Sequence, residues 1–436
     1  MNNPAITGAE YLSLSDLKQL QSERWACQSH YLNEQSAFYR HMLGSSKIPS
    51  KLEAIGSLPF TDKNMLRQDQ QENPAFGSYL AAEESILSRV HRTSGTTGTA
   101  MNLALSAQDA LMTAAVAGRA QTASGLGPQH RVVHCLNYQL WMGGYTDHAG
   151  LEATGATVIP FGVGNGLQLI QVIQELGINA ISCTPSYPAV LEQTLSNHYA
   201  DLKPQDLGLQ LGLFGGEPGL DESAFRQRLE STWGFKARNS NYGVTDVLCN
   251  FAGQTDVCDD LHFLALDVLY PELIDPESNV IKPWREGEQG ELVLTHLAKE
   301  CQPLVRFKTG DIIILTGTDK ATCGRTAPRF RVIGRSDDMV VVRGINVFPT
   351  MITGILNKFT ELSGHWRMTL DRPPPYHALP LQIELARKLT DTAALSNSIV
   401  QNIKQQIGCT AEITLTDPAS IPRSEGKTRY VTRTWQ

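Results

Sequence analysis

The chain has 436 residues, of which 41% are hydrophobic and 19% charged, and its formal net charge is −7. This length exceeds one ordinary core and predicts two or three domains. The acidic balance argues against nucleic acid as a partner, and the lack of a long apolar run argues against a membrane span. Residues 1–10 show no signal-peptide pattern and the eight cysteines are scattered, so we expect a cytoplasmic protein with reduced thiols.

The first half of the chain predicts alternating strands and helices. Helical spacing extends over about 12–45, and a helix N-cap is expected at Thr61 or Asp62. The alternation that follows predicts parallel α/β layers with ligands at the carboxyl ends of the strands. Strands are expected at 131–136, 157–161, 180–184, 209–214 and 236–241, and helices at 166–176 and 186–193.

The pattern changes near residue 260. A strand at 290–295, further strands through Ile314 and Val332, and a short strand at 339–343 predict a smaller β-rich subdomain. The last hundred residues predict a compact α+β domain, with strands at 381–386 and 411–416. Between them Leu395, Ile399, Ile403 and Ile407 recur every fourth residue on a helix that Gly408 can end. The fold class is therefore α/β, with a large N-terminal region of several subdomains and a small C-terminal domain.

The most informative stretch is 91–100, which reads HRTSGTTGTA. Glycines allow close backbone approach and hydroxyls add donors, so the stretch suits a polyphosphate. A solvated turn is the alternative. It is not a Walker A loop, because no lysine follows the last glycine.

Four further motifs follow in order. They are NYGVTD at 241–246, FKTGD at 307–311, GRSDDM at 334–339 with VRGINVFP at 342–349, and PRSEGK at 422–427. With 91–100, this set resembles the adenylate-forming superfamily of acyl-CoA synthetases, peptide-synthetase adenylation domains and luciferases. Within it, the phenylacetate–CoA ligase branch is most similar. The likeness spans roughly 55–430.

The resemblance implies a reaction in two steps. A carboxylic acid attacks the α-phosphate of Mg-ATP to give an acyl-adenylate and pyrophosphate, and coenzyme A then displaces AMP to give a thioester. It also implies an N-terminal adenylation domain at 1–336 and a mobile C-terminal domain at 337–436 that carries the catalytic lysine.

The resemblance assigns most of the ATP site to the motifs. The β- and γ-phosphates are assigned to Ser94, Gly95, Thr96, Thr97 and Gly98, and the adenine to Gly215, Gly216, Glu217 and Pro218, with Asn241, Tyr242 and Gly243 beside them. Tyr242 would stack on the adenine or border the acyl pocket. Core packing is its alternative, and a strand–helix connection is the alternative for 215–218.

Four more residues are assigned to the nucleotide. Thr245 would bond the α-phosphate, Asp246 would orient Mg²⁺, and Asp311 would accept bonds from both ribose hydroxyls. An N-cap is the alternative for Asp246, and a surface turn is the alternative for Asp311. Arg335 is either a phosphate or carboxylate contact or a structural ion pair, and Arg343 is open in the same way.

Three residues concern the second domain. The resemblance makes Lys427 the lysine that bridges the substrate carboxylate and the α-phosphate, with a solvated C-terminal lysine as the alternative. It makes Asp337 the hinge between the half-reactions and places Gly344 along the thiol tunnel.

The acyl pocket is assigned by the same resemblance to five residues. They are Tyr138, Trp141, Gly143, Tyr187 and Phe214. Aromatic side chains there suit a flat aromatic acid, but each aromatic could equally belong to the core.

Three positions depart from the branch pattern. Thr99 stands where a lysine is usual, so the loop lacks its own cation, and Asp246 and Thr353 each replace a glutamate. We still expect an adenylating enzyme, with the thioester step less certain. Cys249, Cys258, His262, Cys301 and Cys323 raise the question of zinc, but without a tight Cys-x₂₋₄-Cys pair we expect reduced cysteines instead.

Two other functions stay open. One is an adenylating enzyme of secondary metabolism that passes the acyl group to a carrier-protein phosphopantetheine, an amine or a reductase. The other is a catalytically silent nucleotide-binding protein. The expected partners are a small carboxylic acid and either coenzyme A or a carrier protein, and a homodimer is consistent with the branch.

Overall fold

The computed structural model describes residues 8–93, 100–199, 201–343, 345–373, 375–422 and 430–435. The predictions for Ser94, Gly95, Thr96, Thr97, Gly98, Thr99, Gly344 and Lys427 lie outside these residues. The chain divides into two compact units. Unit 1 comprises the described residues of Met1–Gly216, Arg228–Thr309 and Ile313–Arg331, and unit 2 those of Glu217–Gln227, Gly310–Ile312 and Val332–Gln436. The predicted domain boundary after residue 336 stays a prediction.

The N-terminal helical region is broken once. Ser13 caps α1 (Leu14–Gln35), and Ser36 ends that helix and caps α2 (Ala37–Leu43). The carboxylate of Asp62 accepts hydrogen bonds from the backbone of Asn64 and Met65 and so begins α3 (Lys63–Glu72). The cap expected at Thr61 or Asp62 is therefore at Asp62.

A twelve-stranded sheet forms the main layer, in the order β11-β10-β12-β13-β14-β9-β8-β7-β6-β5-β3-β4. Its last strands, from β7 to β4, pair in parallel, as the alternation of elements predicts. These parallel strands are β3 (Arg131–His134), β4 (Thr157–Pro160), β5 (Ala180–Cys183), β6 (Leu211–Gly215) and β7 (Lys236–Val244).

The other strands of this sheet form the expected β-rich region. They are β8 (Leu248–Gly253), β9 (Leu261–Phe263), β10 (Leu269–Ile274), β11 (Ile281–Lys282), β12 (Gln289–His296), β13 (Phe307–Gly317) and β14 (Arg329–Arg335). A separate hairpin pairs β1 (Leu87–Arg92) with β2 (Asn102–Ser106).

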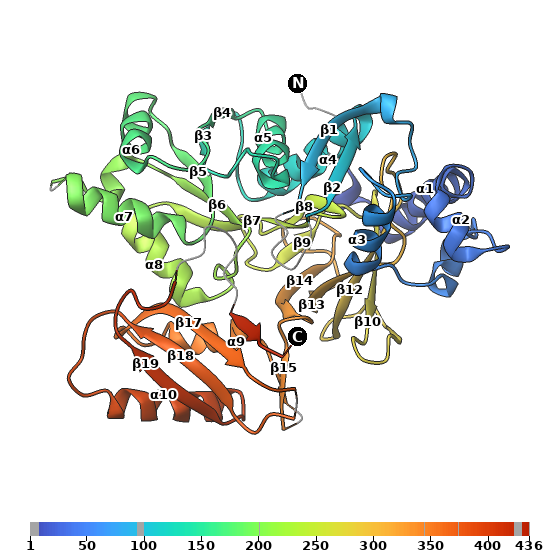
Figure 1. Cartoon of the computed structure of the whole chain (residues 1–436). Helices are drawn as coiled ribbons and strands as arrows, with labels where there is room; N and C mark the ends of the chain where they lie inside the picture. Colours follow the sequence, from blue (N-terminus) through green and yellow to red (C-terminus); the bar gives the residue numbers. More distant parts are fainter. Residues whose placement is uncertain are drawn as a thin grey trace. The chain divides into compact units, whose positions relative to one another are not determined.

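Helices surround the parallel strands (Figure 1). They are α4 (Ala107–Ala123), α5 (Met142–Ala153), α6 (Gly166–Glu175), α7 (Tyr187–His198) and α8 (Ser223–Trp233). Short 3₁₀ helices connect the elements at η1 (Ala9–Tyr11), η2 (Leu52–Ser57), η3 (Glu84–Ile86) and η4 (Pro204–Leu207).

Unit 2 contains its own four-stranded sheet, in the order β19-β18-β17-β20. The strands are β17 (Leu362–Leu370), β18 (Leu379–Leu385), β19 (Ala411–Thr416) and β20 (Val431–Arg433), beside the hairpin β15 (Val340–Val342) and β16 (Ile345–Val347) and the helices α9 (Pro349–Leu356) and α10 (Ala393–Gln406). Figure 1 shows α10 lying along this sheet, and its Ile399 and Ile403 are buried in the core. Gly408, at φ +86°, follows α10 and ends it as expected.

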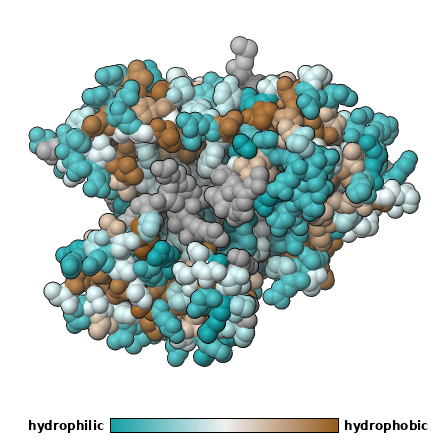
Figure 2. Space-filling model, viewed as in Figure 1, coloured by the Kyte–Doolittle hydropathy of each residue, from teal (hydrophilic) through white to brown (hydrophobic). Residues whose placement is uncertain are grey.

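The visible surface mixes hydrophilic and hydrophobic side chains and is mostly hydrophilic over the N-terminal helices (Figure 2). None of the described helices is long and apolar enough to cross a membrane.

Candidate active site

The predicted turn glycines lie where a parallel strand ends. Gly215 is the last residue of β6, and Gly216 follows it with φ +81°. Strand β7 continues to Val244, three residues beyond its expected end, because Val244 and Tyr242 pair with β8. A Cβ at Gly243 would lie 1.8 Å from the carbonyl oxygen of Cys249, so this close strand pair admits only glycine.

The turn between β7 and β8 carries an ion pair that the sequence did not predict. Asp246 is buried in this turn, and its Oδ2 accepts a hydrogen bond from Lys63 Nζ at 2.9 Å. Lys63 is the first residue of α3, directly after the cap at Asp62, so the N-terminus of that helix places it. The predicted cap was the available signal, since it fixed where α3 begins.

The second oxygen of Asp246 allows a test of the predicted magnesium site. Oδ1 is buried and has no hydrogen-bond partner among the described residues. A buried, unpaired carboxylate oxygen is a ligand that Mg²⁺ prefers, and such a cation would relieve the cost of leaving it unpaired. Asp246 therefore fits the predicted ion, although Lys63 already occupies its other oxygen.

A second buried carboxyl contacts side chains of β7 and β8. Asp147 of α5 accepts hydrogen bonds from Asn241 Nδ2 and, at 3.2 Å, from Cys249 Sγ. Burial raises the pKa of Asp147 to about 7, while these hydrogen bonds act in the opposite direction. Asp147 thus fixes the side chain of Asn241 in β7, and no motif of the sequence signalled this buried carboxyl.

The predicted pocket residue Tyr138 belongs to a chain of polar contacts. Its hydroxyl lies 2.9 Å from His148 Nδ1, and His148 Nε2 lies 3.2 Å from Glu152 Oε1. In the tautomer that donates from Nε2 to the carboxylate, Nδ1 accepts the tyrosine proton. The Tyr138 oxygen is then oriented as an acceptor for a further donor.

His134 of β3 contacts the start of α5 and the neighbouring strand β5. Its Nε2 lies 3.0 Å from the carbonyl oxygen of Gly144, which can only accept, and its Nδ1 lies 3.1 Å from Ser182 Oγ. Burial lowers the pKa of His134 to about 4. The ring is therefore neutral near pH 7, with its proton on Nε2, and it holds the start of α5 against β3 and β5.

The other aromatic predictions fall in different surroundings. Tyr242 packs edge-on against Phe251 and Phe330, with ring centroids 5.2 and 5.4 Å away. Phe214 is fully buried and contacts Phe235, whereas Trp141 and Tyr187 are partly exposed. Thr245 is also partly exposed, and Gly143 lies in the first turn of α5 near Asp147. The pocket assignment of Trp141, Gly143, Tyr187 and Phe214 and the α-phosphate assignment of Thr245 stay predictions.

Unit 2 joins three predicted residues through one guanidinium. Arg335 donates from Nη1 to Asp311 Oδ1 at 2.8 Å and from Nε to Asp337 Oδ1 at 2.9 Å. The two carboxylates raise the pKa of Arg335 further above its usual range, against the effect of burial. Gly310 makes room for this contact, because a Cβ there would lie 2.7 Å from Arg335 Nη2. Of the two interpretations of Arg335, the structural ion pair is present, with Asp311 and Asp337 as partners.

The end of the chain returns to the predicted hinge. Arg433 of β20 donates to the carbonyl oxygens of Asp337 and Met339 at 2.8 and 3.1 Å. Strand β20 itself pairs in parallel with β17. The residues that follow the predicted catalytic segment are thus anchored within unit 2, although Lys427 lies outside the described residues.

The cysteines and the histidine that the sequence offers as zinc ligands have different surroundings. His262 Nε2 lies 3.7 Å from Cys323 Sγ, while Cys249 bonds to Asp147 and Cys301 is buried. Across the described ranges, no group of three or more His, Cys, Asp or Glu side chains is placed to hold a metal ion. Cys258 is half-buried and belongs to no such group.

Two family models match this chain. The model of the AMP-binding enzyme family matches residues 56–296, and that of the AMP-binding enzyme C-terminal domain matches 344–434. The chain belongs to the AMP-binding enzyme family. This AMP-binding enzyme is 32% identical to a phenylacetate-coenzyme A ligase of Thermus thermophilus over 448 residues, which cover 96% of each chain. It is 30% identical to a phenylacetate-coenzyme A ligase of Escherichia coli over 439 residues, with 98% and 97% covered.

A solved structure supports the same placement. A 2-hydroxyisobutyryl-CoA ligase in its postadenylation state matches with a TM-score of 0.87 and 26% identity, over 98% of this chain and 91% of that one. The predicted fold class and the resemblance to the phenylacetate–CoA ligase branch are therefore confirmed. The roles of individual residues in this AMP-binding enzyme stay predictions.

Proposed function

We propose that this AMP-binding enzyme activates a carboxylic acid with ATP, releases pyrophosphate, and transfers the acyl group from the adenylate to coenzyme A. One observation carries the proposal. Relatives named phenylacetate-coenzyme A ligase align with almost the whole chain, so both the adenylating and the C-terminal regions have counterparts in such ligases. The 2-hydroxyisobutyryl-CoA ligase adds a CoA ligase of similar fold.

The chemistry requires charge neutralisation at the α-phosphate while two anions are held together. We assign Asp246 Oδ1 to Mg²⁺, which would supply Lewis-acid stabilisation of the phosphates when bound. Thr245 lies one residue before it and would donate to the α-phosphate. Lys63 Nζ, 2.9 Å from Asp246 Oδ2, supplies positive charge at the same turn. We assign to Lys63 the positive charge that a lysine usually supplies at residue 99 in the branch.

Arg335 gives Asp311 a defined geometry for the ribose. Arg335 holds the Asp311 carboxylate through a charge-assisted hydrogen bond at 2.8 Å, and we assign this carboxylate to the two ribose hydroxyls. Lys427 is proposed as the mobile cation that bridges the substrate carboxylate and the α-phosphate. Residues from Asp337 onward are proposed to move as a body between the two half-reactions.

The acid is proposed to be aromatic and compact. Tyr138 supports this choice, since its hydroxyl is fixed by His148 and its ring lies 5.6 Å from that of His134 in an edge-on contact. The relatives named for phenylacetate act on an acid of this kind, which supports the same class.

Carboxylate-dependent exchange of pyrophosphate into ATP tests the adenylation step. We expect a panel of aryl and short aliphatic acids to show strongest exchange with an aryl acid, and Lys427→Ala to abolish it. A Lys404→Ala variant, on the exposed face of α10, is the matched control and retains exchange. If no acid of the panel supports exchange, the mechanism is contradicted. Undiminished exchange in Lys427→Ala contradicts it as well.

The acceptor is tested separately, by thioester formation with coenzyme A. If exchange occurs but no thioester forms, the alternative of a carrier-protein phosphopantetheine, an amine or a reductase replaces coenzyme A. Location in the cytoplasm, where ATP and coenzyme A are available, and assembly as a homodimer are part of the proposal. Light scattering of the purified protein measures the oligomeric state.

A further inference from the structure

Unit 1 contains a pocket at a distance from the proposed active site. It has a volume of about 390 Å³ and is lined by Thr122, Ala123, Asp256, Val257, Thr322, Cys323 and Arg325. Asp256 lies three residues after the end of β8 at Gly253, whereas Asp246 lies two residues before its start at Leu248. A six-residue strand at about 3.3 Å per residue separates the two by roughly 20 Å. The pocket is therefore distinct from the turn that holds Asp246 and Lys63.

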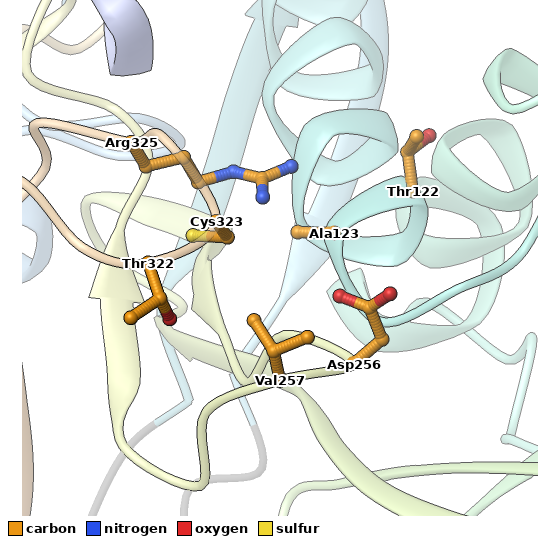
Figure 3. Close-up of a pocket in the computed structure, with 7 residues that line it drawn as sticks. All are labelled: Thr122, Ala123, Asp256, Val257, Thr322, Cys323 and Arg325. Carbon is orange, nitrogen blue, oxygen red and sulfur yellow. The ribbon is translucent and has the colours of Figure 1, made fainter.

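The guanidinium of Arg325 points into this pocket (Figure 3). Arg325 is 8% exposed, and its Nε is buried with no hydrogen-bond partner in the described part of the chain. The contact found for the group is with the ring of Tyr11, whose centroid lies 5.1 Å from Cζ. A buried guanidinium without an acceptor is costly, so an acceptor in the pocket would stabilise it.

Within the described ranges, Arg325 forms no ion pair with a neighbouring carboxylate. His262 lies behind Cys323, and burial together with Arg325 lowers its pKa to about 4, so it is uncharged near pH 7. Glu10 lies within electrostatic reach of Arg325, and its Oε2 is buried without a hydrogen-bond partner among the described residues. No ion pair between Glu10 and Arg325 occurs among the described residues.

The wall opposite Arg325 has the reverse character. Figure 3 shows Asp256 across the pocket, between Val257 and the end of α4 that carries Thr122 and Ala123. The Asp256 side chain is exposed, so a ligand group that meets it must carry a donor, and a second anionic group there would be repelled. Val257 and Ala123 provide a small apolar surface between the two charges.

We propose that this pocket binds a small organic acid whose carboxylate pairs with Arg325 and whose other end presents an amine or hydroxyl to Asp256. A planar guanidinium pairs with a carboxylate through two parallel hydrogen bonds. The volume is in the range of small-molecule sites and exceeds what an inorganic ion needs. The charge pattern selects amino acids and hydroxy acids over dicarboxylates. This inference does not depend on the proposed ligase activity.

Cys323 provides a reporter inside the pocket. Glycine, the L-amino acids other than cysteine, whose thiol would consume the reagent, glycolate and L-lactate are added one at a time to the full chain. Iodoacetamide labelling is followed for each cysteine by peptide mass spectrometry. At least one of these acids should slow the labelling of Cys323 several-fold and leave the exposed Cys27 unchanged. An acid bound at the ATP-dependent site would not protect Cys323. If no acid of the panel protects Cys323, the proposal is overturned.

Variants test the two charges. Arg325→Met keeps an apolar stem but removes the cation and should abolish protection, whereas Arg331→Met removes an exposed arginine of β14 and should retain it. Asp256→Asn should weaken binding of the protecting acid. Retained protection in Arg325→Met, or unchanged binding in Asp256→Asn, contradicts the assigned contacts.

A third variant keeps the test valid if Arg325→Met does not fold. Thr122 is exposed at the mouth of the pocket, so Thr122→Trp fills the pocket from the surface. Titration calorimetry with the protecting acid should show lost binding in Thr122→Trp. Binding as tight as that of the unmodified chain would place the acid elsewhere and overturn the proposal.

Discussion

At the scale of single residues, Lys63 and Asp246 determine the charge at the turn between β7 and β8. The carboxylate is 5% exposed and the lysine 39%, so the pair is only partly screened by water. Lys63→Met should lower pyrophosphate exchange about tenfold, equivalent to about 1.4 kcal/mol in the barrier. Because Asp246 would then have both oxygens free, the Mg²⁺ concentration that half-saturates the reaction should fall.

The matched control for this prediction is Lys18→Met. Lys18 lies 3.7 Å from Glu53 with both side chains largely exposed, and such surface pairs contribute little. Exchange and Mg²⁺ dependence should therefore be unchanged in this variant. A Lys63→Met enzyme with the same Mg²⁺ dependence as Lys18→Met would rule out a role for Lys63 at the metal.

Asp147 makes a second residue-scale prediction, on pH. Its pKa is raised from an ordinary 3.8 to about 7, so between these values the folded chain holds a proton that the unfolded chain has lost. Its contribution to stability is fully present below about pH 4 and is lost as the pH rises to about 7. Asp147→Asn removes the titrating carboxyl. The unfolding free energy of the variant, relative to that of the unmodified chain, should therefore increase as the pH rises from about 4 to about 7.

Urea unfolding of both chains from pH 4 to pH 8 measures the effect. The buried His134 and His296, whose pKa values are lowered, shift stability with pH in the opposite direction in both chains. The difference between the two chains therefore isolates Asp147. Parallel stability curves would show that Asp147 titrates at an ordinary pKa.

At the scale of elements, Thr353 connects α9 to the sheet of unit 2. Its Oγ1 accepts a hydrogen bond from Trp366 Nε1 of β17 at 3.0 Å, and Trp366 also stacks on Tyr430. The threonine that departs from the branch pattern thus has a structural partner. Thr353→Val leaves the buried indole N–H unpaired and should cost about 1–2 kcal/mol of unfolding free energy.

Denaturant unfolding compares this variant with Thr360→Val. Thr360 is exposed, so the same substitution there should change stability by no more than about 0.5 kcal/mol. Equal losses in the two variants would indicate a generic effect of valine in place of threonine.

At the scale of the whole molecule, Arg335 ties the proposed ribose ligand to the proposed hinge. Arg335→Gln should release Asp337 from Asp311 and remove the guanidinium that pairs with the buried Asp311 carboxylate. We expect the KM for ATP to rise and the rates of exchange and thioester formation to change by different factors. Arg331→Gln on the same strand β14 is the control, because its partner Asp260 lies outside this cluster. Equal factors for both half-reactions would limit Arg335 to nucleotide binding.

Local patterns predicted much of this architecture. The Asp62 cap, the parallel strands from β3 to β7 and the end of α10 at Gly408 follow from short-range chemistry, namely side-chain capping, apolar alternation and a left-handed glycine. The short strand β20 was missed, because it is stabilised by pairing with β17, about sixty residues earlier in the chain. Strand β7 extended past its expected end for the same reason.

The sequence by itself determined the family, the fold class and the order of the motifs, because these depend on residue types and spacings along one chain. Only the tertiary structure decided which charged and polar side chains meet. Lys63 reaches Asp246 across 183 residues, Asn241 reaches Asp147 across 94, and Arg335 reaches Asp311 across 24. Such pairs form because burial penalises a charged or polar group that lacks a partner. The number of residues between two such groups does not indicate whether folding brings them together.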